Sequence, residues 1–152
     1  EDEFSLLHQD HLTEGMLDYL QENKISFVPY FPLASGLLTG KYTTDATFPA
    51  DDIRSQIADF KEPRYSTILH AVDLVRPIAD NHHATIAQII LAWYLQNPLI
   101  TAVIPGAKNA RQVLSNAKAM KIELSTDEYQ TIEQAFNQFK QIKSGKSLKD
   151  PD

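Results

Sequence analysis

Cysteine is absent from the 152-residue chain, which excludes disulfides, thiolate chemistry and cysteine-ligated metal centres. No apolar run approaches the about 18 residues of a membrane span, and the first residues, Glu-Asp-Glu, do not resemble a signal peptide. Positive charge is also scarce, because 14 Lys and Arg face 20 Asp and Glu, for a net charge of −6. This balance argues against a nucleic-acid or anionic-membrane surface, both of which need clustered positive charge. We therefore expect a cytoplasmic protein.

Helical and strand-like segments alternate along the chain. Hydrophobic residues make up 43% of the sequence, enough for one globular domain with a core, which we place at residues 1–143 before a polar tail at 144–152. Apolar residues recur at helical spacing in 10–23, 64–81, 85–97, 109–120 and 125–139. Two short apolar runs, 25–30 and 100–104, have the length of strands. The alternation predicts an α/β fold with a parallel sheet.

Local signals refine these segments. Asp10 and Asn109 are predicted N-caps, and Thr85 and Ser125 each begin a capping box. Pro77 predicts a kink late in 64–81.

Three further features have ordinary interpretations. A strand over 25–30 should end at Pro29 or pair on one side only, because proline has no amide to donate. The long polar connection 43–63 is typical of a lid, a binding loop or a disordered segment. His82-His83 is interpreted as a solvated helix end and Asp51-Asp52 as a turn signal, so we predict no metal site.

Two glycine-containing blocks are the most informative feature of the sequence. Residues 30–42 read YFPLASGLLTGKY and residues 104–116 read IPGAKNARQVLSN. Each apolar run stops at proline and glycine and leads backbone amides and a lysine into a loop, which suits a phosphate-bearing cofactor. Gly106 leaves room for an anion, and Lys108 with Arg111 adds positive charge suited to a 2′-phosphate, favouring NADP over NAD.

In this order, the two blocks resemble the last two strand-to-loop connections of the aldo/keto reductases, nicotinamide-dependent enzymes built on a (β/α)8 barrel. The resemblance extends from Glu1 to about Phe136. It implies the C-terminal half of a (β/α)8 TIM barrel, with parallel strands inside and helices outside. A complete barrel needs about 250 residues, so we expect this chain to supply only that half.

The resemblance also implies which residues bind NADP(H). It assigns nicotinamide stacking to Tyr30, the pyrophosphate to the following loop, and the adenosine 2′-phosphate and adenine to the second block. The implied residues are Tyr30, Phe31, Pro32, Leu33, Gly36, Leu38, Gly40, Lys41, Ile104, Gly106, Ala107, Lys108, Gln112 and Asn116. Arg54 matches a basic residue on the long loop more loosely. Glu1 and Ser115 depart from the family's usual glutamine and glutamate.

The implied activity is reduction of small aldehydes or ketones by hydride transfer. The family's catalytic tyrosine, lysine, aspartate and histidine belong to its first four strands, so we predict no catalytic residue in this chain and no activity of the chain alone. An alternative is a non-catalytic nucleotide-sensing or partner-binding module, since some members of the family are channel subunits. A third interpretation, a helical adaptor without a cofactor, treats both glycine blocks as turns.

The apolar runs raise one more expectation. Strands of a barrel are buried on both faces, so without an opposite wall Phe27 and Val103 would face water. The sequence therefore predicts self-association, pairing with the missing N-terminal half, or collapse of a helix onto this surface.

Overall fold

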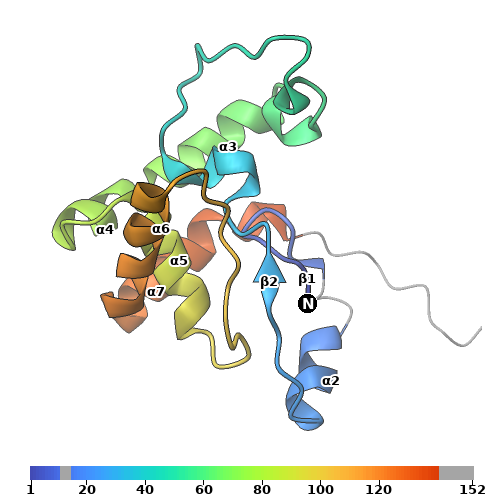
Figure 1. The fold of residues 1–152 in the computed structure, drawn as a ribbon, viewed down its shortest axis with the longest axis vertical. Helices are drawn as coiled ribbons and strands as arrows, with labels where there is room; N and C mark the ends of the chain where they lie inside the picture. The colour runs from blue at the N-terminus through green and yellow to red at the C-terminus, as the bar shows by residue number, and fades with distance from the viewer. Residues whose placement is uncertain (11–14, 141–152) are drawn as a thin grey trace, which may run out of the picture.

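Two short parallel strands lie side by side, with most of the helices to one side of them (Figure 1). The computed structural model describes residues 1–10 and 15–140, so the predicted tail at 144–152 lies outside the described residues. Strand β1 (Asp2–Glu3) pairs in parallel with β2 (Pro29–Tyr30). On the other side of β2, single parallel bridges join Phe27 to Ile100 and Tyr30 to Ile104. The predicted parallel α/β arrangement is therefore present, with β2 between the first segment and residues 100–104.

The strands are shorter than the sequence predicted. Residues 25–30 form a two-residue strand, and 100–104 form isolated bridges. The prediction that pairing would end at Pro29, or use one side only, is wrong. Pro29 lies opposite Asp2 in the register, while its carbonyl accepts a hydrogen bond of 3.0 Å from the amide of Ile104. Neither contact requires the amide that proline lacks, because the neighbouring Val28 and Tyr30 carbonyls bond to β1.

Five α-helices follow β2 in the chain. They are α3 (Arg64–Asp73), α4 (Arg76–Asn81), α5 (Ile86–Gln96), α6 (Ala110–Ala117) and α7 (Thr126–Ala135). The 3-10 turns η1 (Ala34–Thr39), η2 (Ile53–Ser55) and η3 (Ala58–Phe60) lie between β2 and α3, η4 (Lys118–Lys121) lies between α6 and α7, and η5 (Asn137–Phe139) follows α7. The predicted helix 64–81 is broken rather than kinked, because Pro77 sits in the first turn of α4 and begins a new helix.

Helix α2 (Met16–Glu22) begins later than predicted. Its N-cap position is Gly15, with φ of 69°, in place of the predicted Asp10, and position 12 of the predicted apolar face lies outside the described residues. None of the helices in the described ranges 1–10 and 15–140 is both long and apolar enough to cross a bilayer.

The other cap predictions are confirmed. The Thr85 hydroxyl accepts from the amide of Gln88, whose side chain accepts from the amide of Thr85. Ser125 and Glu128 form the same reciprocal pair at the start of α7. Asn109 accepts from the amide of Gln112 at 3.0 Å, starting α6. These contacts satisfy amides that the first turn of a helix leaves without partners.

An aromatic core lies between β2 and α5. Phe4 packs edge-on against Phe27 at 5.6 Å between ring centroids and in a stacked arrangement against Trp93 at 6.4 Å. Phe27 is only 2% exposed, so the expectation that it would face water is wrong: Phe4, from the segment after β1, covers it. Val103 is partly buried against the same core.

Gly40 gives a first prediction about this fold. It has φ of +73°, and an added Cβ would lie 2.5 Å from Cδ1 of Ile86. A left-handed residue with a side chain costs about 1–2 kcal/mol, and the contact with Ile86 adds to it. We expect Gly40→Ala to lower the free energy of unfolding by about 2 kcal/mol or more, measured by urea denaturation.

Gly15 supplies the matched control, because it has φ of +69° but nothing within 4 Å of an added Cβ. Gly15→Ala should therefore cost only the backbone strain. Equal losses for the two variants would show that the contact with Ile86 contributes nothing.

Candidate functional site

The loop that follows β2 turns sharply over the end of the strand. Tyr30 and Phe31 are exposed there, and Phe31, Ala34, Ser35 and Gly36 all have left-handed backbone conformations. The turn is anchored from below, since the Tyr94 hydroxyl donates to the buried carbonyl of Pro32 at 2.9 Å. Burial raises the pKa of Tyr94, which keeps the hydroxyl protonated as a donor. The loop is thus a fixed feature that presents aromatic rings at the strand end.

Lys41 folds back over this loop. Its ammonium lies 4.7 Å from the ring centroid of Tyr42, and an added Cβ on Gly36 would come within 2.9 Å of Nζ. Glycine at position 36 therefore provides both the left-handed φ and the room for the lysine. Leu38, in contrast, is fully buried, so only its backbone could meet a ligand. Pro32 is also buried, Leu33 and Gly40 are half-buried, and Lys41 is exposed.

The second glycine loop is open and exposed. Ile104, Gly106, Ala107 and Lys108 are all exposed, and an added Cβ on Gly106 would meet nothing within 4 Å. The conformation of Gly106 is outside the left-handed region, so this structure shows space at position 106 but no backbone need for glycine.

The first turn of α6 is hydrogen-bonded to the second glycine loop, which precedes it. The amide of Lys108 donates to Oε1 of Gln112 at 2.6 Å, which leaves the ammonium of Lys108 on the exposed side. Asn116 is half-buried one turn further along the helix. Ser115 faces α5, where its carbonyl accepts from Nε2 of Gln88 at 2.8 Å. Glu1 is exposed beside β1.

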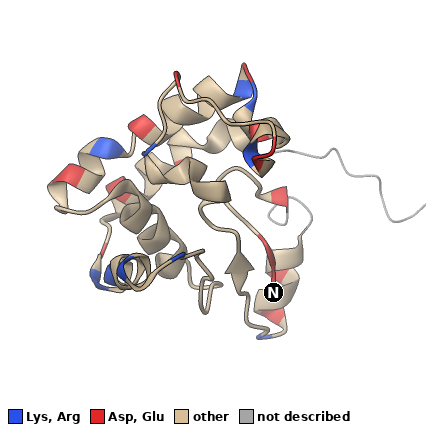
Figure 2. Cartoon of the chain, turned by 45° about the horizontal axis from the view of Figure 1, so that its top comes forward, with Lys and Arg blue, Asp and Glu red and all other residues tan. Residues whose placement is uncertain are grey.

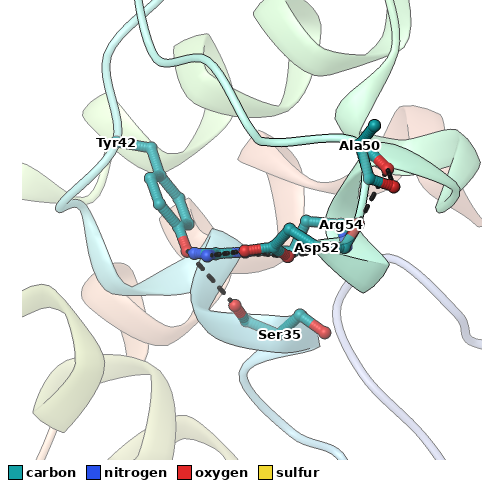
Figure 3. Close-up of polar contacts among 6 residues, drawn as sticks. Ser35, Tyr42, Ala50, Asp52 and Arg54 are labelled. Atoms are coloured by element: carbon teal, nitrogen blue, oxygen red, sulfur yellow. Dashed lines mark hydrogen bonds and ion pairs between the residues drawn. The ribbon is translucent and has the colours of Figure 1, made fainter.

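A polar cluster joins the long loop to the first glycine block through Arg54 and Tyr42 (Figure 3). Arg54 donates through Nη1 to the Tyr42 hydroxyl at 2.6 Å and through Nε to Oδ1 of Asp52 at 2.8 Å. These contacts with Arg54, and to a smaller extent the charge of Lys108, lower the pKa of Asp52 to about 2. Lys108 is therefore within electrostatic range of Asp52, the carboxylate that binds Arg54, and Arg54 in turn donates to Tyr42 at the end of the first glycine block.

The result is a cationic face built from three segments. Lys41 and Arg54 lie 4.7 and 5.8 Å from the ring centroid of Tyr42, and Lys108 of the second glycine loop acts on Asp52, the carboxylate that partly offsets the charge of Arg54. The stretch that carries Lys108, residues 81–122, contains no Asp or Glu, whereas the long loop adds Asp45 and Asp51. Figure 2 shows basic but no acidic residues where α6 follows the second glycine loop. Such a face suits a polyphosphate ligand.

Sequence reasoning missed part of this cluster. Asp52 does form the predicted turn, since its carboxylate accepts from the amide of Arg54 at 2.9 Å, but it also binds the guanidinium. Tyr42 had no assigned role. The Asp-x-Arg spacing was the available signal for the ion pair, whereas nothing local indicated that Tyr42 would meet Arg54 twelve positions away.

The histidine pair is only partly as predicted. His82 follows α4, but its Nε2 lies 3.0 Å from Oε1 of Glu128 at the start of α7, so it is a link between helices and not merely a solvated end. Across residues 1–10 and 15–140, no group of three His, Asp or Glu side chains is placed to hold a metal ion.

Comparison with known proteins gives one family. The model of the aldo/keto reductase family matches residues 1–137. An aldo-keto reductase of Schizosaccharomyces pombe, whose name specifies NADP(+), is 31% identical over 80% of this chain and 36% of its own length. A probable voltage-gated potassium channel subunit beta of Arabidopsis thaliana is 32% identical over 79% of this chain and 37% of its own length.

The fold comparison agrees. The structure of a glycerol dehydrogenase from Gluconobacter oxydans superposes with a TM-score of 0.77 at 25% identity, covering 88% of this chain and 40% of that one. The chain spans about a third of the length of the curated relatives it matches, from 33% to 39%.

Proposed function

Because the chain belongs to the aldo/keto reductase family, we propose that it is the NADP-binding part of an oxidoreductase that reduces small aldehydes or ketones. The observation that carries this proposal is the convergence of Lys41, Arg54 and Lys108 beside two loops that leave parallel strands. The carboxyl ends of parallel strands are where barrel enzymes bind their ligands, and phosphate is often held after the last two strands.

The residues present suit the cofactor in chemistry and in position. Tyr30 is exposed at the end of β2, where its ring could stack on a nicotinamide, and the loop from Phe31 to Lys41 would follow the pyrophosphate. Lys108 would meet the 2′-phosphate, since it is exposed and lies in a stretch, residues 81–122, that contains no Asp or Glu. When bound, NADPH supplies the hydride, and the groups of this chain bind and orient it.

The same proposal places the chain as the C-terminal half of a (β/α)8 barrel. Its open surface supports this: on and after α6, Val113 is 55% exposed, Leu114 68% and Met120 76%, although all three are apolar. Large exposed apolar side chains in neighbouring positions mark a surface that another part covers. We propose that the family's N-terminal strands and helices, on the same or another chain, cover it.

A second candidate function belongs to the same family. Relatives include channel beta subunits by name, such as that of A. thaliana, so the cofactor site could serve nucleotide sensing instead of turnover. Turnover of an aldehyde in a completed barrel distinguishes the two functions, since a sensing module would bind NADPH without oxidising it.

The test uses a chimera in which this chain replaces the matching C-terminal part of the S. pombe relative. A charge-assisted contact to phosphate is worth about 1–3 kcal/mol, so Lys108→Met should weaken NADPH binding by about tenfold or more. Binding of NADH, which has no 2′-phosphate, should be nearly unchanged. Quenching of protein fluorescence on titration with each cofactor measures both constants.

Lys118→Met is the matched control, because Lys118 is exposed in η4 and belongs to neither glycine loop. It should leave both constants unchanged. A chimera that folds but binds neither cofactor would contradict the proposed function, and equal losses for NADPH and NADH would remove Lys108 from the phosphate site.

A further inference from the structure

A hydrogen bond between distant segments joins the long loop to the region after β1. Nε2 of His8 lies 2.9 Å from Oδ2 of Asp59, which is 51 positions later in the chain. Asp59 belongs to η3 and is only 6% exposed, and its other oxygen accepts from Nε of Arg64 at 2.5 Å. A buried carboxylate needs such partners, because burying an unpaired charge is expensive. His8, whose side chain is 40% exposed, and Arg64 are therefore the two partners that the structure shows for this buried carboxylate.

The pair spans a hollow of about 300 Å³. The hollow is lined by Glu3 of β1, by His8 in the segment after β1, by Phe31, Ala34 and Ser35 of the loop after β2, and by Ile57, Ala58, Asp59 and Phe60 of the long loop. The bond between His8 and Asp59 therefore joins two of the segments that line it.

The rest of the long loop is fixed differently. Phe48 packs edge-on against Tyr42 and Phe60, at 5.5 and 5.1 Å between ring centroids, and the Tyr65 hydroxyl donates to the carbonyl of Thr43 at 2.9 Å. These contacts tie the loop to its own flanking residues. They do not reach β1, so a change at His8 leaves them in place. Because Phe60 belongs to this aromatic cluster and Arg64 also binds Asp59, loss of the His8 bond should loosen residues 57–60 without unfolding the base of the loop.

We propose that His8 is a positioning residue: its bond to Asp59 is a latch that holds residues 57–60 over the loop after β2 and so controls access to that loop. The consequence for the cofactor rests on the proposed function, because Phe31 and Ser35 lie on the segment proposed to follow the pyrophosphate. The latch itself is a property of the chain without any ligand.

The charges around the latch make it sensitive to pH. The hydrogen bond to Asp59 raises the pKa of His8 above its ordinary 6.5, although burial opposes the shift. The other charged groups that face His8 are Glu3 of β1, Arg64 of α3, and Asp2 and Asp10, which line the adjoining hollow. Of these, Glu3 raises the pKa of His8 and Arg64 lowers it.

The sign of the effect follows from these shifts. For Asp59, burial favours the neutral acid, but the bonds from His8 and Arg64 outweigh it and lower the pKa. Asp59 is thus charged throughout the neutral range. His8 contributes its charged bond fully below pH 6.5, and this contribution is lost as the pH rises through its raised pKa. The latch is closed in mildly acidic solution and loosens as the solution becomes alkaline.

Amide hydrogen exchange of the chain without cofactor tests the latch. After correction for intrinsic rates, protection of residues 53–60 in the parent should fall by about fivefold between about pH 6 and about pH 8.5. His8→Gln, which cannot become charged, should show the low protection at every pH. His8→Arg, which stays charged, should keep the high protection at every pH.

His82→Gln is the matched control, because His82 also pairs with a carboxylate. Its partner is Glu128, and the pair joins the end of α4 to the start of α7, away from the long loop. It should leave the exchange profile of residues 53–60 unchanged. The proposal would be overturned if His8→Gln kept the pH-dependent protection of the parent. It would also be overturned if His82→Gln lost that pH-dependent protection. If His8→Gln loses its helical circular dichroism, His8→Arg decides: pH-independent protection supports the latch, and parent-like pH dependence overturns it.

The chimera separates this proposal from the proposed function. With a working latch and a cofactor site, His8→Gln should speed NADPH release at pH 6 by about fivefold, measured by stopped-flow fluorescence. Failure of the chimera to bind NADPH would contradict the proposed function and leave the exchange profile standing. A flat exchange profile in a chain whose chimera binds NADPH would overturn only the latch.

Discussion

The chain alone is expected to give no NADPH-dependent reduction of 4-nitrobenzaldehyde, whereas the chimera with the S. pombe relative should give a readily measured rate. A positioned general acid contributes about 10²–10⁴-fold to such a reaction, and the resemblance to the family predicts that the acid and its partners lie outside this chain. Loss of the surrounding site lowers the rate further. The expected difference in rate between the chain and the chimera is therefore the largest that we predict. A spectrophotometric assay measures it, because NADPH loses its absorbance at ~340 nm when it is oxidised.

The structure explains why two nearby tyrosines are poor substitutes for the acid. The Tyr42 hydroxyl is held between Arg54 and the carbonyl of Ser35. The Tyr65 hydroxyl donates to the carbonyl of Thr43, and burial raises its pKa. Tyr42→Phe in the chimera should consequently retain the catalytic rate constant. A rate of the isolated chain that survives repurification and disappears on Tyr30→Phe or Tyr42→Phe would contradict the prediction.

Trp93→Ala is expected to cause the largest loss of stability. The indole is 1% exposed and lies at the centre of the core, stacked against Tyr129 at 5.8 Å and against Phe4 at 6.4 Å, with Tyr94 edge-on at 4.9 Å. Truncation of a buried Trp to Ala costs about 3–5 kcal/mol, because the cavity is only partly refilled. The midpoint of urea denaturation and its slope give the free energy of unfolding.

Trp93→Phe separates packing from hydrogen bonding. Within the described residues, Nε1 of Trp93 is buried without a hydrogen-bond partner. Phenylalanine keeps most of the aromatic contact and removes this unsatisfied donor, so the two effects partly offset each other. We expect a loss well below that of Trp93→Ala. Equal losses for Trp93→Phe and Trp93→Ala would show that the ring contacts kept by phenylalanine contribute little, and would contradict this prediction.

The proposed cofactor site and the proposed latch both include residues of the long loop. Arg54 and Asp52 bring this loop to the cationic face, and His8 and Asp59 bring it to the end of β1. The loop predicted to be a lid, a binding loop or a disordered segment is therefore ordered by contacts at both sides. Its behaviour as a lid is what the exchange experiment decides.

The sequence by itself determined the features that depend on neighbouring residues. The caps at Thr85, Asn109 and Ser125 were predicted correctly because each involves a side chain and an amide three positions away. The order and content of the two glycine blocks likewise indicated the family, since backbone approach and positive charge need those residue types wherever the loops lie. Parallel pairing followed from the alternation of segments.

Only the tertiary structure decided features that join distant residues. Pro29 can lie within β2 because the carbonyls of its neighbours Val28 and Tyr30 face the first segment and accept hydrogen bonds from Asp2 and Phe4. Phe27 is buried because Phe4 comes from another segment to cover it. The bond between His8 and Asp59 spans 51 positions, and no local pattern encodes it. Such contacts depend on how the segments pack, and packing is set by the shape of the whole core and not by any short stretch of sequence.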